Sequence, residues 1–548
     1  MKTKKRFIVI FVSLIVLISF SIEPVFARLK FSLQEKDEVI LIRDNFGVPH
    51  VYAKNLYGLY YGYGYALATD RLFQMEMTRR TVLGKVSEVL GSAYINFDKG
   101  IRSNYSPDSI QAQLDALPRK YKDIFEGYAD GMNARIKEVL ANPNTLLPKQ
   151  FIDYGFLPTF WTPFDVVMIF VGTMCNRFGD FNTELDNLAF LEYLQGAYGE
   201  ETAWKIFNQT KWVNDPGAPT TIMADDPVMV KKSIQPKLAK PSFIKSRNIF
   251  VMQRLEEERL QERKLLEKIG LEILADPPLA SNLWMINKKK TDDGMGSIIL
   301  NGPQFGWYVP GYVYEIGLHA PGIDIIGNTP FGYPVILFGH NKHIAWGSTA
   351  GLGDLIDIYE EVLNPANPYQ YWFNGEWRDM EKRTEIISVK DGTPVTVDVY
   401  RTVHGFVIKF DMENHLAYSK RRSWEGFEIQ SLIGWIESTW AENFWQWRKA
   451  ASKMALNVNW YYADRMGNIG YIYCGRYPLR KENHDWRFPV RGTGEMEWLG
   501  FLPFEKNPQV YNPKRGYIVN WNNKPSPTWN DPDMWWLVWG SADRVQVI

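Results

Sequence analysis

The chain has 548 residues, of which 45% are hydrophobic and 23% charged, and its formal net charge is zero. This length is too great for one small core, so several domains or one large layered unit is expected. Nucleic-acid-binding proteins normally carry an excess of basic residues, so the zero net charge weighs against that class. The 21 Trp, 29 Tyr and 31 Phe are typical of a large antiparallel-sheet core or of an aromatic-lined pocket.

The first 27 residues have the pattern of a secretory signal peptide. Four basic residues within the first six positions precede an apolar run over residues 7–20, and Val25-Phe26-Ala27 provides the small residues that a signal peptidase reads. We predict cleavage after Ala27 and secretion to the periplasm or the medium, with retention of this segment as a membrane anchor as the alternative. No other stretch of sequence reaches the roughly 18 uninterrupted apolar residues of a membrane-spanning helix.

Residues 38–226 are predicted to form short strands followed by several helices. The expected elements are strands Glu38–Arg43 and Val51–Ala53 and helices Ala66–Arg80, Ser106–Ala141, Thr162–Arg177 and Glu184–Leu194. Ser106 and Thr162 are N-cap candidates, because each precedes a proline at the first helical position. The glycines at positions 58, 62 and 64 predict a close approach of one backbone to another.

Between residues 227 and 280 the composition changes to that of a solvated spacer. A basic, proline-broken stretch over residues 231–247 precedes a helix expected over Glu256–Lys268, in which opposite charges fall three or four residues apart. Asp276-Pro277-Pro278 ends this charged segment. A linker or removable spacer is the favoured interpretation, and a short coiled-coil partner helix is the alternative.

From Ser281 onward strand patterns dominate. The expected strands are Leu283–Ile286 and Ser297–Leu300, paired as a hairpin around Asp292-Asp293-Gly294, then Pro334–Phe338, His343–Trp346, Val395–Arg401, Trp460–Ala463, Ile469–Cys474 and Tyr517–Asn520. The two cysteines, Cys175 and Cys474, have apolar neighbours, so buried free thiols are predicted rather than a disulfide framework.

Three kinds of catalytic site fit an exported chain of this composition to different degrees. A Ser-His-Asp triad lacks support, because none of the seven histidines accompanies a G-x-S-x-G nucleophile elbow. Carboxylate pairs for glycoside cleavage occur in any chain of this length, so an aromatic-rich carbohydrate binder remains an alternative. The third kind is a serine at a new N-terminus, whose α-amino group, with a pKa of about 7.7 to 8.0, serves as base for its own hydroxyl. Cleavage between Ala280 and Ser281 produces such a residue, although residue patterns alone do not single out Ser281.

A series of long motifs does single it out. The motifs are YGYGYALATDRLFQMEM, EGYADGMNARI, FDVVMIFVGTMCNRF, TELDNLA, SNLW, NGPQFGWY, GNTPFGYPVILFGHN, GSTAGLGD, NWYYAD, GYIVNWNNKP and WGSADR. In identity and order they resemble the penicillin acylase (penicillin amidase) family of the N-terminal nucleophile hydrolase superfamily. The resemblance runs from about Asp44 to Arg544 and is interrupted only at the spacer.

The resemblance implies a catalytic role for five positions. Ser281 corresponds to the nucleophile, and its own amine to the base, which acts through a bridging water. The Ala350 N–H and the Asn522 side chain correspond to the oxyanion hole. The Gln304 carbonyl corresponds to the group that orients the amine, and Arg544 to the arginine that tunes it.

The resemblance also implies a binding pocket and a metal site. Residues matching an apolar pocket for a phenylacetyl ring and its surroundings are Met174, Arg177, Phe178, Phe305, Phe338, Ser348, Leu352, Trp435 and Val458. Of these, Arg177 corresponds to the residue that meets the polar half of the substrate. Leu352 and Val458 replace the Phe and Ile that are common in the family, so a different acyl preference is expected. Ligands matching one structural calcium are Glu184, Asp354, Ile356, Asp357, Trp486 and Asp533, of which Ile356 and Trp486 contribute backbone oxygens.

Together these inferences predict an α+β fold resembling the four-layer αββα sandwich of the superfamily, with a mostly helical N-terminal chain wrapped around it. The predicted organisation is a signal peptide over residues 1–27, an alpha chain over 28–235, a spacer propeptide over 236–280 and a beta chain over 281–548. The two chains of one precursor form a heterodimer that hydrolyses arylacetyl amides, without nucleic acid and without a membrane after signal removal. An acyl-homoserine lactone acylase and an inactive, unprocessed remnant are the alternatives. The family's beta chain continues well beyond WGSADR, so the sequence is expected to end before that fold is complete.

Overall fold

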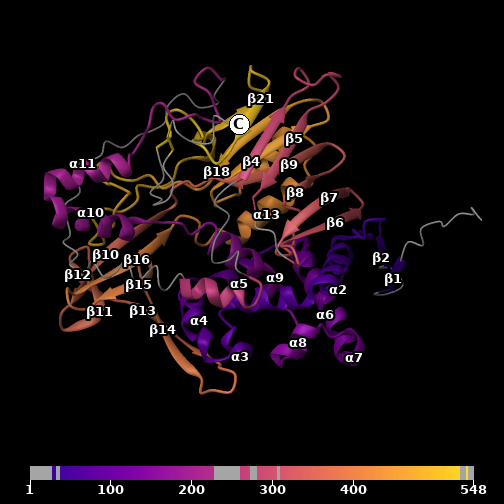
Figure 1. Ribbon diagram of the computed structural model, residues 1–548, viewed down its shortest axis with the longest axis horizontal. Helices are drawn as coiled ribbons and strands as arrows, with labels where there is room; N and C mark the ends of the chain where they lie inside the picture. The colour runs from indigo at the N-terminus through magenta and orange to yellow at the C-terminus, as the bar shows by residue number, and fades with distance from the viewer. Residues whose placement is uncertain are drawn as a thin grey trace, which may run out of the picture.

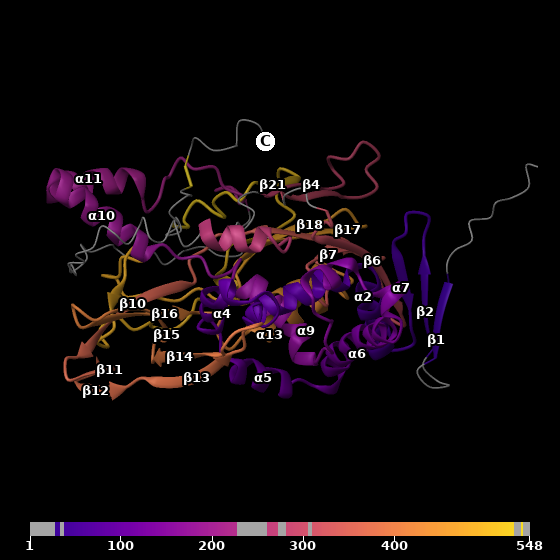
Figure 2. The same cartoon turned by 60° about the horizontal axis from the view of Figure 1, so that its bottom comes forward.

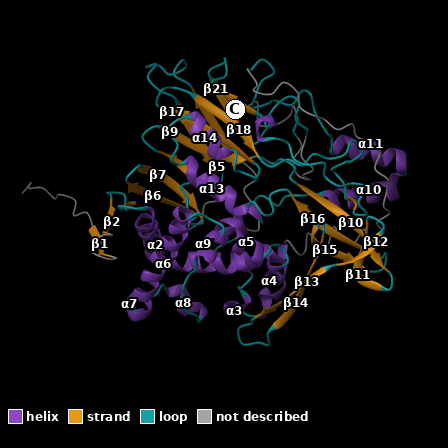
Figure 3. Ribbon diagram, turned by 180° about the vertical axis from the view of Figure 1, so that it is seen from behind, coloured by secondary structure: helices purple, strands orange, loops and turns teal. Residues whose placement is uncertain are grey.

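The computed structural model describes residues 28–32, 38–226, 260–271, 281–304, 309–530 and 539–540. Helices dominate the described residues before residue 227, and strands dominate those after Ser281 (Figure 3). The expected α+β class is therefore present. Within the described residues no helix is both long enough and apolar enough to cross a membrane.

The helices of the described chain lie mainly between residues 56 and 210. Apart from the helical residues 260–267, they are α2 (Leu56–Leu83), α3 (Ser87–Leu90), η1 (Ser92–Tyr94), α4 (Ile95–Arg102), α5 (Pro107–Asp115), α6 (Arg119–Ala141), α7 (Pro143–Leu146), α8 (Lys149–Tyr154), α9 (Pro163–Phe170), the π-helical turn η2 (Val171–Cys175), α10 (Glu184–Tyr198), α11 (Glu200–Thr210), α13 (Glu428–Ser438), α14 (Phe444–Ala451) and η4 (Phe504–Lys506). The predicted caps are confirmed, because the side chain of Ser106 accepts from Ser109 N–H and Thr162 forms a capping box with Asp165.

The largest sheet has ten strands, ordered β1-β2-β3-β6-β7-β8-β9-β17-β18-β20. They are β1 (Arg28–Ser32), β2 (Glu38–Arg43), β3 (Pro49–Tyr52), β6 (Val313–Ala320), β7 (Ile323–Pro330), β8 (Phe338–His340), β9 (Ile344–Ala350), β17 (Val458–Asp464), β18 (Ile469–Cys474) and β20 (Gln509–Tyr511). This sheet joins strands from both sides of the spacer, because β3 pairs with β6 in parallel, with Val51 opposite Leu318.

A second sheet lies to one side of the first (Figure 1) and is built from the middle of the sequence. Its strands are β10 (Ile356–Asn364), β11 (Asn367–Phe373), β12 (Glu376–Asp379), β13 (Glu381–Ile387), β14 (Val395–Thr402), β15 (Gly405–Asp411), β16 (Leu416–Arg422) and β19 (Val490–Arg491). Strand β10 is placed against the N-terminal half of the chain by its contacts with α10.

A third, three-stranded sheet carries Ser281. Its order is β21-β4-β5, formed by β21 (Tyr517–Asn520), β4 (Ser281–Ile286) and β5 (Ile298–Pro303). It contacts the ten-stranded sheet through β4 and β5 on β9 and through β21 on β18. Figure 2 shows β4 and β21 above β17 and β18, with α2, α6, α9 and α13 on the other side of the large sheet. Helices α2, α6, α9 and α13, the large sheet and the small sheet are thus stacked in that order.

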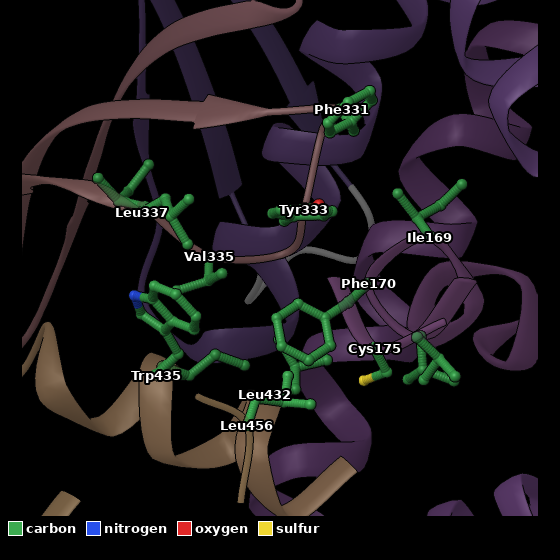
Figure 4. Packing of buried hydrophobic residues seen from close by; sticks show 14 of the residues in the cluster. Ile169, Phe170, Cys175, Phe331, Tyr333, Val335, Leu337, Leu432, Trp435 and Leu456 are labelled. Carbon is green, nitrogen blue, oxygen red and sulfur yellow. The ribbon is translucent and has the colours of Figure 1, made fainter. Parts of the chain in front are cut away.

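The core fills the space between the helical layer and the large sheet. Figure 4 shows Phe331, Tyr333, Val335 and Leu337 from one segment packing with Phe170, Trp435 and neighbouring apolar residues. Helices α2 and α6 cross closely, because a Cβ at Gly64 would lie 2.1 Å from Tyr128 O and one at Gly131 would lie 1.9 Å from Tyr61 O. The close backbone approach predicted from the glycines is therefore confirmed at Gly64.

Several predicted boundaries differ from the structure, including that of the helix expected over Ser106–Ala141, which is divided into α5 and α6. The stretch Pro334–Phe338 was expected to be a strand, but only Phe338 belongs to one, as the first residue of β8. The preceding residues 331–337 are irregular and buried on all sides, and periodicity does not distinguish such a run from a buried strand. Helix α2 begins at Leu56 rather than near Ala66, because burial around its whole circumference stabilises a Gly- and Tyr-rich first half of low helix propensity.

Candidate active site

Ser281 is the first residue of β4, the middle strand of the small sheet. Its partner on β5 is Pro303, and two residues further along β4 Leu283 pairs with Asn520 on β21. The Ser281 side chain belongs to the buried face of the strand, with only 6% of the residue exposed. This register brings the loop after β21 alongside the serine, although 241 residues separate Ser281 from Asn522.

The Asn522 side chain contacts both functional groups of Ser281. The Ser281 backbone N–H donates to Asn522 Oδ1 at 2.8 Å, and Asn522 Nδ2 lies 3.4 Å from Ser281 Oγ. The backbone of Asn522 is left-handed, with φ of 68°, a conformation that asparagine tolerates better than most residues. In the uncleaved chain the Ser281 nitrogen is a peptide amide. A break before Ser281 converts this nitrogen to an amine beside the Ser281 hydroxyl.

Ala350, the last residue of β9, lies next to this pair. Its carbonyl accepts from Asn522 Nδ2 and from Asn459 Nδ2, each at 2.9 Å. Gln304 directly follows Pro303, the strand partner of Ser281, and is exposed. Three of the five predicted catalytic residues therefore meet at one point, and Gln304 is adjacent in the chain to the strand that pairs there. Arg544 lies outside the described residues.

Sequence reasoning missed a buried polar network behind these residues. Thr349 Oγ1 donates to Asn520 Oδ1 at 2.9 Å, and Asn459 Nδ2 donates to Thr349 Oγ1 at 3.1 Å. Tyr471 in turn donates its hydroxyl to Asn459 Oδ1 at 2.6 Å. The available signal was the run Asn520-Trp521-Asn522-Asn523, since three asparagines in four residues are unusual in a segment that also has to be buried.

The predicted pocket residues of the N-terminal part are presented by the π-helical turn η2. Met174 lies within this turn, and the Phe178 N–H donates to Thr173 O at 2.9 Å just beyond it. Single π-helical turns widen a helix and are frequent at functional sites. The Phe178 ring lies 5.9 Å from the ring of Phe331, and Met174, Phe178 and Phe338 all pack against the main core.

The remaining pocket residues come from β9, β17 and α13. Ser348 pairs with Trp460, and Ala350 pairs with Val458, so Ser348 and Val458 lie on the same face of the large sheet as Trp460. The Trp460 ring is 5.1 Å from that of Trp435, which is 6.2 Å from Phe170 on α9. Leu352 follows β9 with φ of 62°, and Phe305 lies outside the described residues. An aromatic-rich region between η2, α13 and β9 thus contains most of the predicted pocket.

Part of the predicted spacer packs on this region. Residues 260–267 are helical, as expected, and Arg177 Nη2 donates to Glu262 Oε1 at 2.5 Å. Leu266 and Leu271 are fully buried, and the hydroxyls of Tyr94 and Tyr312 donate to Leu265 O and Gly270 O at 3.0 and 3.1 Å. The residue predicted to meet the polar half of the substrate is therefore paired with a carboxylate of the predicted spacer. Residues 256–259 of the predicted spacer helix lie outside the described part of the chain.

Three of the predicted calcium ligands lie where α10 meets β10. Glu184, the first residue of α10, accepts the Ile358 N–H at 3.0 Å. Arg480 bridges the other two, with Nη2 2.8 Å from Asp354 Oδ1 and Nε 2.9 Å from Asp357 Oδ2. Burial alone raises the pKa of Asp357, but the charges of Arg480 and His484 outweigh it and hold that pKa well below its ordinary value.

In the part of the chain that the structure describes, the other predicted calcium ligands are not seen to form a site with these carboxylates. Ile356 begins β10, Trp486 is buried, and Asp533 is among the residues that the structure does not describe. Over the described ranges, no group of three or more His, Cys, Asp or Glu side chains is arranged to hold a metal ion. The donor chemistry still suits a hard cation, because carboxylate and carbonyl oxygens are the ligands that Ca²⁺ takes. Arg480 provides the positive charge between Asp354 and Asp357 in this structure.

Comparison with known proteins places these observations in a family. The family model described as penicillin amidase matches residues 38–548. The chain is 47% identical to penicillin G acylase of Escherichia coli over 531 residues. These aligned residues are 94% of this chain and 62% of the relative. The chain is 26% identical over 489 residues to penicillin acylase 2 proenzyme of Pseudomonas sp. (strain SE83), covering 88% of this chain and 58% of the relative.

A solved structure and a relative named for a different activity complete the comparison. The thermostable penicillin G acylase from Alcaligenes faecalis, in its orthorhombic form, is 50% identical and superposes with a TM-score of 0.46 over 47% of each chain. An acyl-homoserine lactone acylase of Pseudomonas fluorescens (strain Pf0-1) is 24% identical over 495 residues, which is 88% of this chain and 56% of that relative. The chain therefore spans between about half and two thirds of the length of the curated relatives it matches.

Proposed function

Because the chain belongs to the penicillin amidase family, we propose that it is the precursor of a penicillin acylase. The mature protein hydrolyses the side-chain amide of penicillin G and of other arylacetyl amides through an acyl-enzyme on Ser281. The observation that carries the proposal is the contact of one side chain, Asn522, with both the nitrogen and the hydroxyl of Ser281. The 47% identity to a penicillin G acylase favours this substrate class over homoserine lactones, whose acylase among these relatives is 24% identical.

The proposed reaction uses groups of this chain and water. Cleavage between Ala280 and Ser281 frees the Ser281 amine, which accepts the hydroxyl proton through a water as Oγ attacks the amide carbonyl carbon. The charge that develops on the carbonyl oxygen is stabilised by Asn522 Nδ2 and by the Ala350 N–H. The leaving amine takes the proton, and a water molecule then hydrolyses the ester on Ser281 by the same route.

The proposal includes export, removal of the spacer and a four-layer fold. A signal peptide over residues 1–27 directs secretion, removal of a spacer over 236–280 separates an alpha chain (28–235) from a beta chain (281–548), and the two remain together as a heterodimer. The stacking of a helical layer, a large sheet and a small sheet supports the four-layer αββα sandwich as the complete fold. The ion pair between Glu262 and Arg177 supports a role for the spacer in covering the pocket until it is removed.

A structural calcium ion belongs to the same proposal. Glu184, Asp354, Asp357 and Asp533 supply carboxylate oxygens, and Ile356 and Trp486 supply backbone oxygens. Because Glu184 lies on the alpha chain and the others on the beta chain, such an ion joins the two products of processing. It serves stability rather than the chemical step.

The test is to replace the nucleophile and follow both cleavage and hydrolysis. Wild-type protein is expected to yield a chain beginning Ser-Asn-Leu-Trp and to hydrolyse a chromogenic phenylacetyl amide. Ser281→Ala is expected to stay as one chain without activity, whereas Ser452→Ala, at an exposed serine whose hydroxyl bonds only within α14, serves as the control. Normal cleavage before residue 281 in Ser281→Ala would overturn the proposal.

A further inference from the structure

Asn520, the last residue of β21, is fully buried and uses both ends of its side-chain amide. Its Oδ1 accepts the Asn522 backbone N–H at 2.9 Å and the Thr349 hydroxyl at 2.9 Å. Its Nδ2 donates to Thr221 Oγ1 at 2.8 Å. One side chain therefore connects the loop that carries Asn522, the end of β9 next to Ala350, and a segment that precedes the spacer. Resting on the function proposed above, we infer that Asn520, itself held by Thr221 and Thr349, is a positioning residue that sets the orientation of the Asn522 amide.

The bond to the Asn522 N–H fixes an otherwise unfavourable backbone conformation. Asn522 has φ of 68°, and a side-chain oxygen that accepts the N–H two residues ahead closes the tight turn in which such a residue is accommodated. The Trp539 indole holds the other side of the same residue by donating to Asn522 O at 2.8 Å. With its backbone held at both ends, Asn522 directs Oδ1 to the Ser281 nitrogen and Nδ2 to the space between Ser281 Oγ and Ala350 O.

Thr221 brings the end of the predicted alpha chain into this arrangement. Its N–H donates to Lys524 O at 2.9 Å, and the next N–H, that of Ile222, donates to Pro525 O at 3.0 Å. Arg515 anchors the segment further by pairing with Asp226 at 2.8 Å. Residues 220–226 therefore run beside the chain that immediately follows Asn522, and they remain needed after the spacer is removed.

A buried, fully bonded asparagine usually serves folding alone, so the test must separate positioning from stability. Asn520→Ala removes all three bonds, and Asn507→Ala is a matched control. Asn507 is equally buried, but its Nδ2 donates to Gly475 O, away from Ser281. Active sites are counted by titration with a serine-reactive sulfonyl fluoride, and kcat per titrated site and KM are measured with a phenylacetyl amide.

Asn520→Ala is expected to lower kcat per titrated site by roughly 10- to 100-fold, because a displaced oxyanion donor loses stabilisation that appears only in the transition state. Its KM is expected to stay within about threefold, since the acyl pocket is unaffected. Asn507→Ala is expected to reduce the yield of folded protein without changing kcat per site. Thr221→Val, which removes the acceptor for Asn520 Nδ2, is expected to reproduce part of the loss in kcat, and Thr221→Ser, which retains the hydroxyl, to restore it.

An unchanged kcat per titrated site in Asn520→Ala would overturn the inference while leaving the proposed function intact. If the wild-type chain is neither cleaved nor active, the proposed function fails, and the inference is then decided by crystal structures of the uncleaved wild-type and Asn520→Ala chains. The inference predicts that the Asn522 amide leaves Ser281 N and Ala350 O in the variant. An amide that keeps both contacts would overturn it in that case as well.

Discussion

Glu262 and Arg177 form an ion pair, with Arg177 Nη2 2.5 Å from Glu262 Oε1, that joins the described part of the spacer to the edge of the predicted pocket. Both side chains are largely buried, and Leu266 and Leu271 anchor the same segment in the core. Glu262→Gln is expected to weaken this attachment by about 1 kcal/mol, which is about fivefold in the population of the detached segment. Limited proteolysis within residues 260–271 of uncleaved Ser281→Ala protein measures it directly.

Glu267→Gln is the matched control for that measurement. Glu267 pairs with Arg263 within the same helix at 3.0 Å, and both side chains are about half exposed. Its loss removes a charge from the spacer without removing a contact to the rest of the protein. Equal acceleration of proteolysis in both variants would show that the charge of the helix, rather than the pair with Arg177, controls the attachment.

Asp180 and Arg422 connect the predicted alpha chain to the predicted beta chain. Arg422 donates to Asp180 through Nε at 2.5 Å and Nη2 at 2.8 Å, and Lys420 Nζ is 3.0 Å from Asp180 Oδ2. Asp180→Asn leaves two buried cations without their counter-charge, so a loss of about 3–5 kcal/mol in the free energy of unfolding is expected. Denaturant titration measures it, and Asp153→Asn, which removes an exposed pair with Lys149, is expected to change little.

Local sequence signals predicted the elements whose causes are local. The caps at Ser106 and Thr162 depend on a side chain that bonds three residues ahead, and both were correct. The hairpin of β4 and β5 was indicated by its turn residues Asp292-Asp293-Gly294, and the strands β17 and β18 were also predicted. The two cysteines are buried and free, as their neighbours indicated. Of the candidate site, Ser281 and Asn522 were found through family motifs and not through any local physical rule.

What the sequence did not reveal depends on contacts between distant segments. Thr221 and Thr349 look like ordinary polar residues in their own neighbourhoods, and only the packing of three segments joins them to Asn520 in one network. The same holds for Arg480, whose pairing with Asp354 and Asp357 follows no spacing that a pattern could detect. The apolar run before Phe338 predicts a strand, because an irregular segment that is buried on all sides has the same apolar composition as a buried strand.

His404 is predicted to make the stability of the second sheet depend on pH. Its ring lies 3.9 Å from that of Tyr359, Nδ1 is 2.8 Å from Glu361 and Nε2 is 2.6 Å from Glu497, which Arg421 also contacts at 2.7 Å. Burial lowers the pKa of His404, but the hydrogen bonds and charges of the two carboxylates outweigh burial and raise it above its ordinary value. The protonated ring therefore contributes stability in full below about pH 6.5, and this contribution is lost as the pH rises through the raised pKa.

Thermal unfolding between pH 5 and 9 tests this dependence. The wild-type melting temperature is expected to fall on the alkaline side, and His404→Gln is expected to be less stable at pH 6 with a flatter profile above it. His340→Gln, at an exposed histidine, controls for loss of an imidazole elsewhere in the chain. A His404→Gln profile parallel to that of the wild type would contradict the prediction.

Arg480 and a calcium ion are expected to compete for the same carboxylates. Binding of Ca²⁺ through Asp354 and Asp357 requires Arg480 to give up contacts of 2.8 and 2.9 Å. Arg480→Gln removes the competing charge, so apparent calcium affinity is expected to increase by about tenfold, while the metal-free variant is less stable because two buried carboxylates lose their partner. Isothermal titration with CaCl₂ and thermal unfolding in excess chelator measure the two effects. Melting temperatures that respond to neither calcium nor chelator, in wild type and variant alike, would remove the metal from the proposal and leave Arg480 as the permanent cation of this cluster.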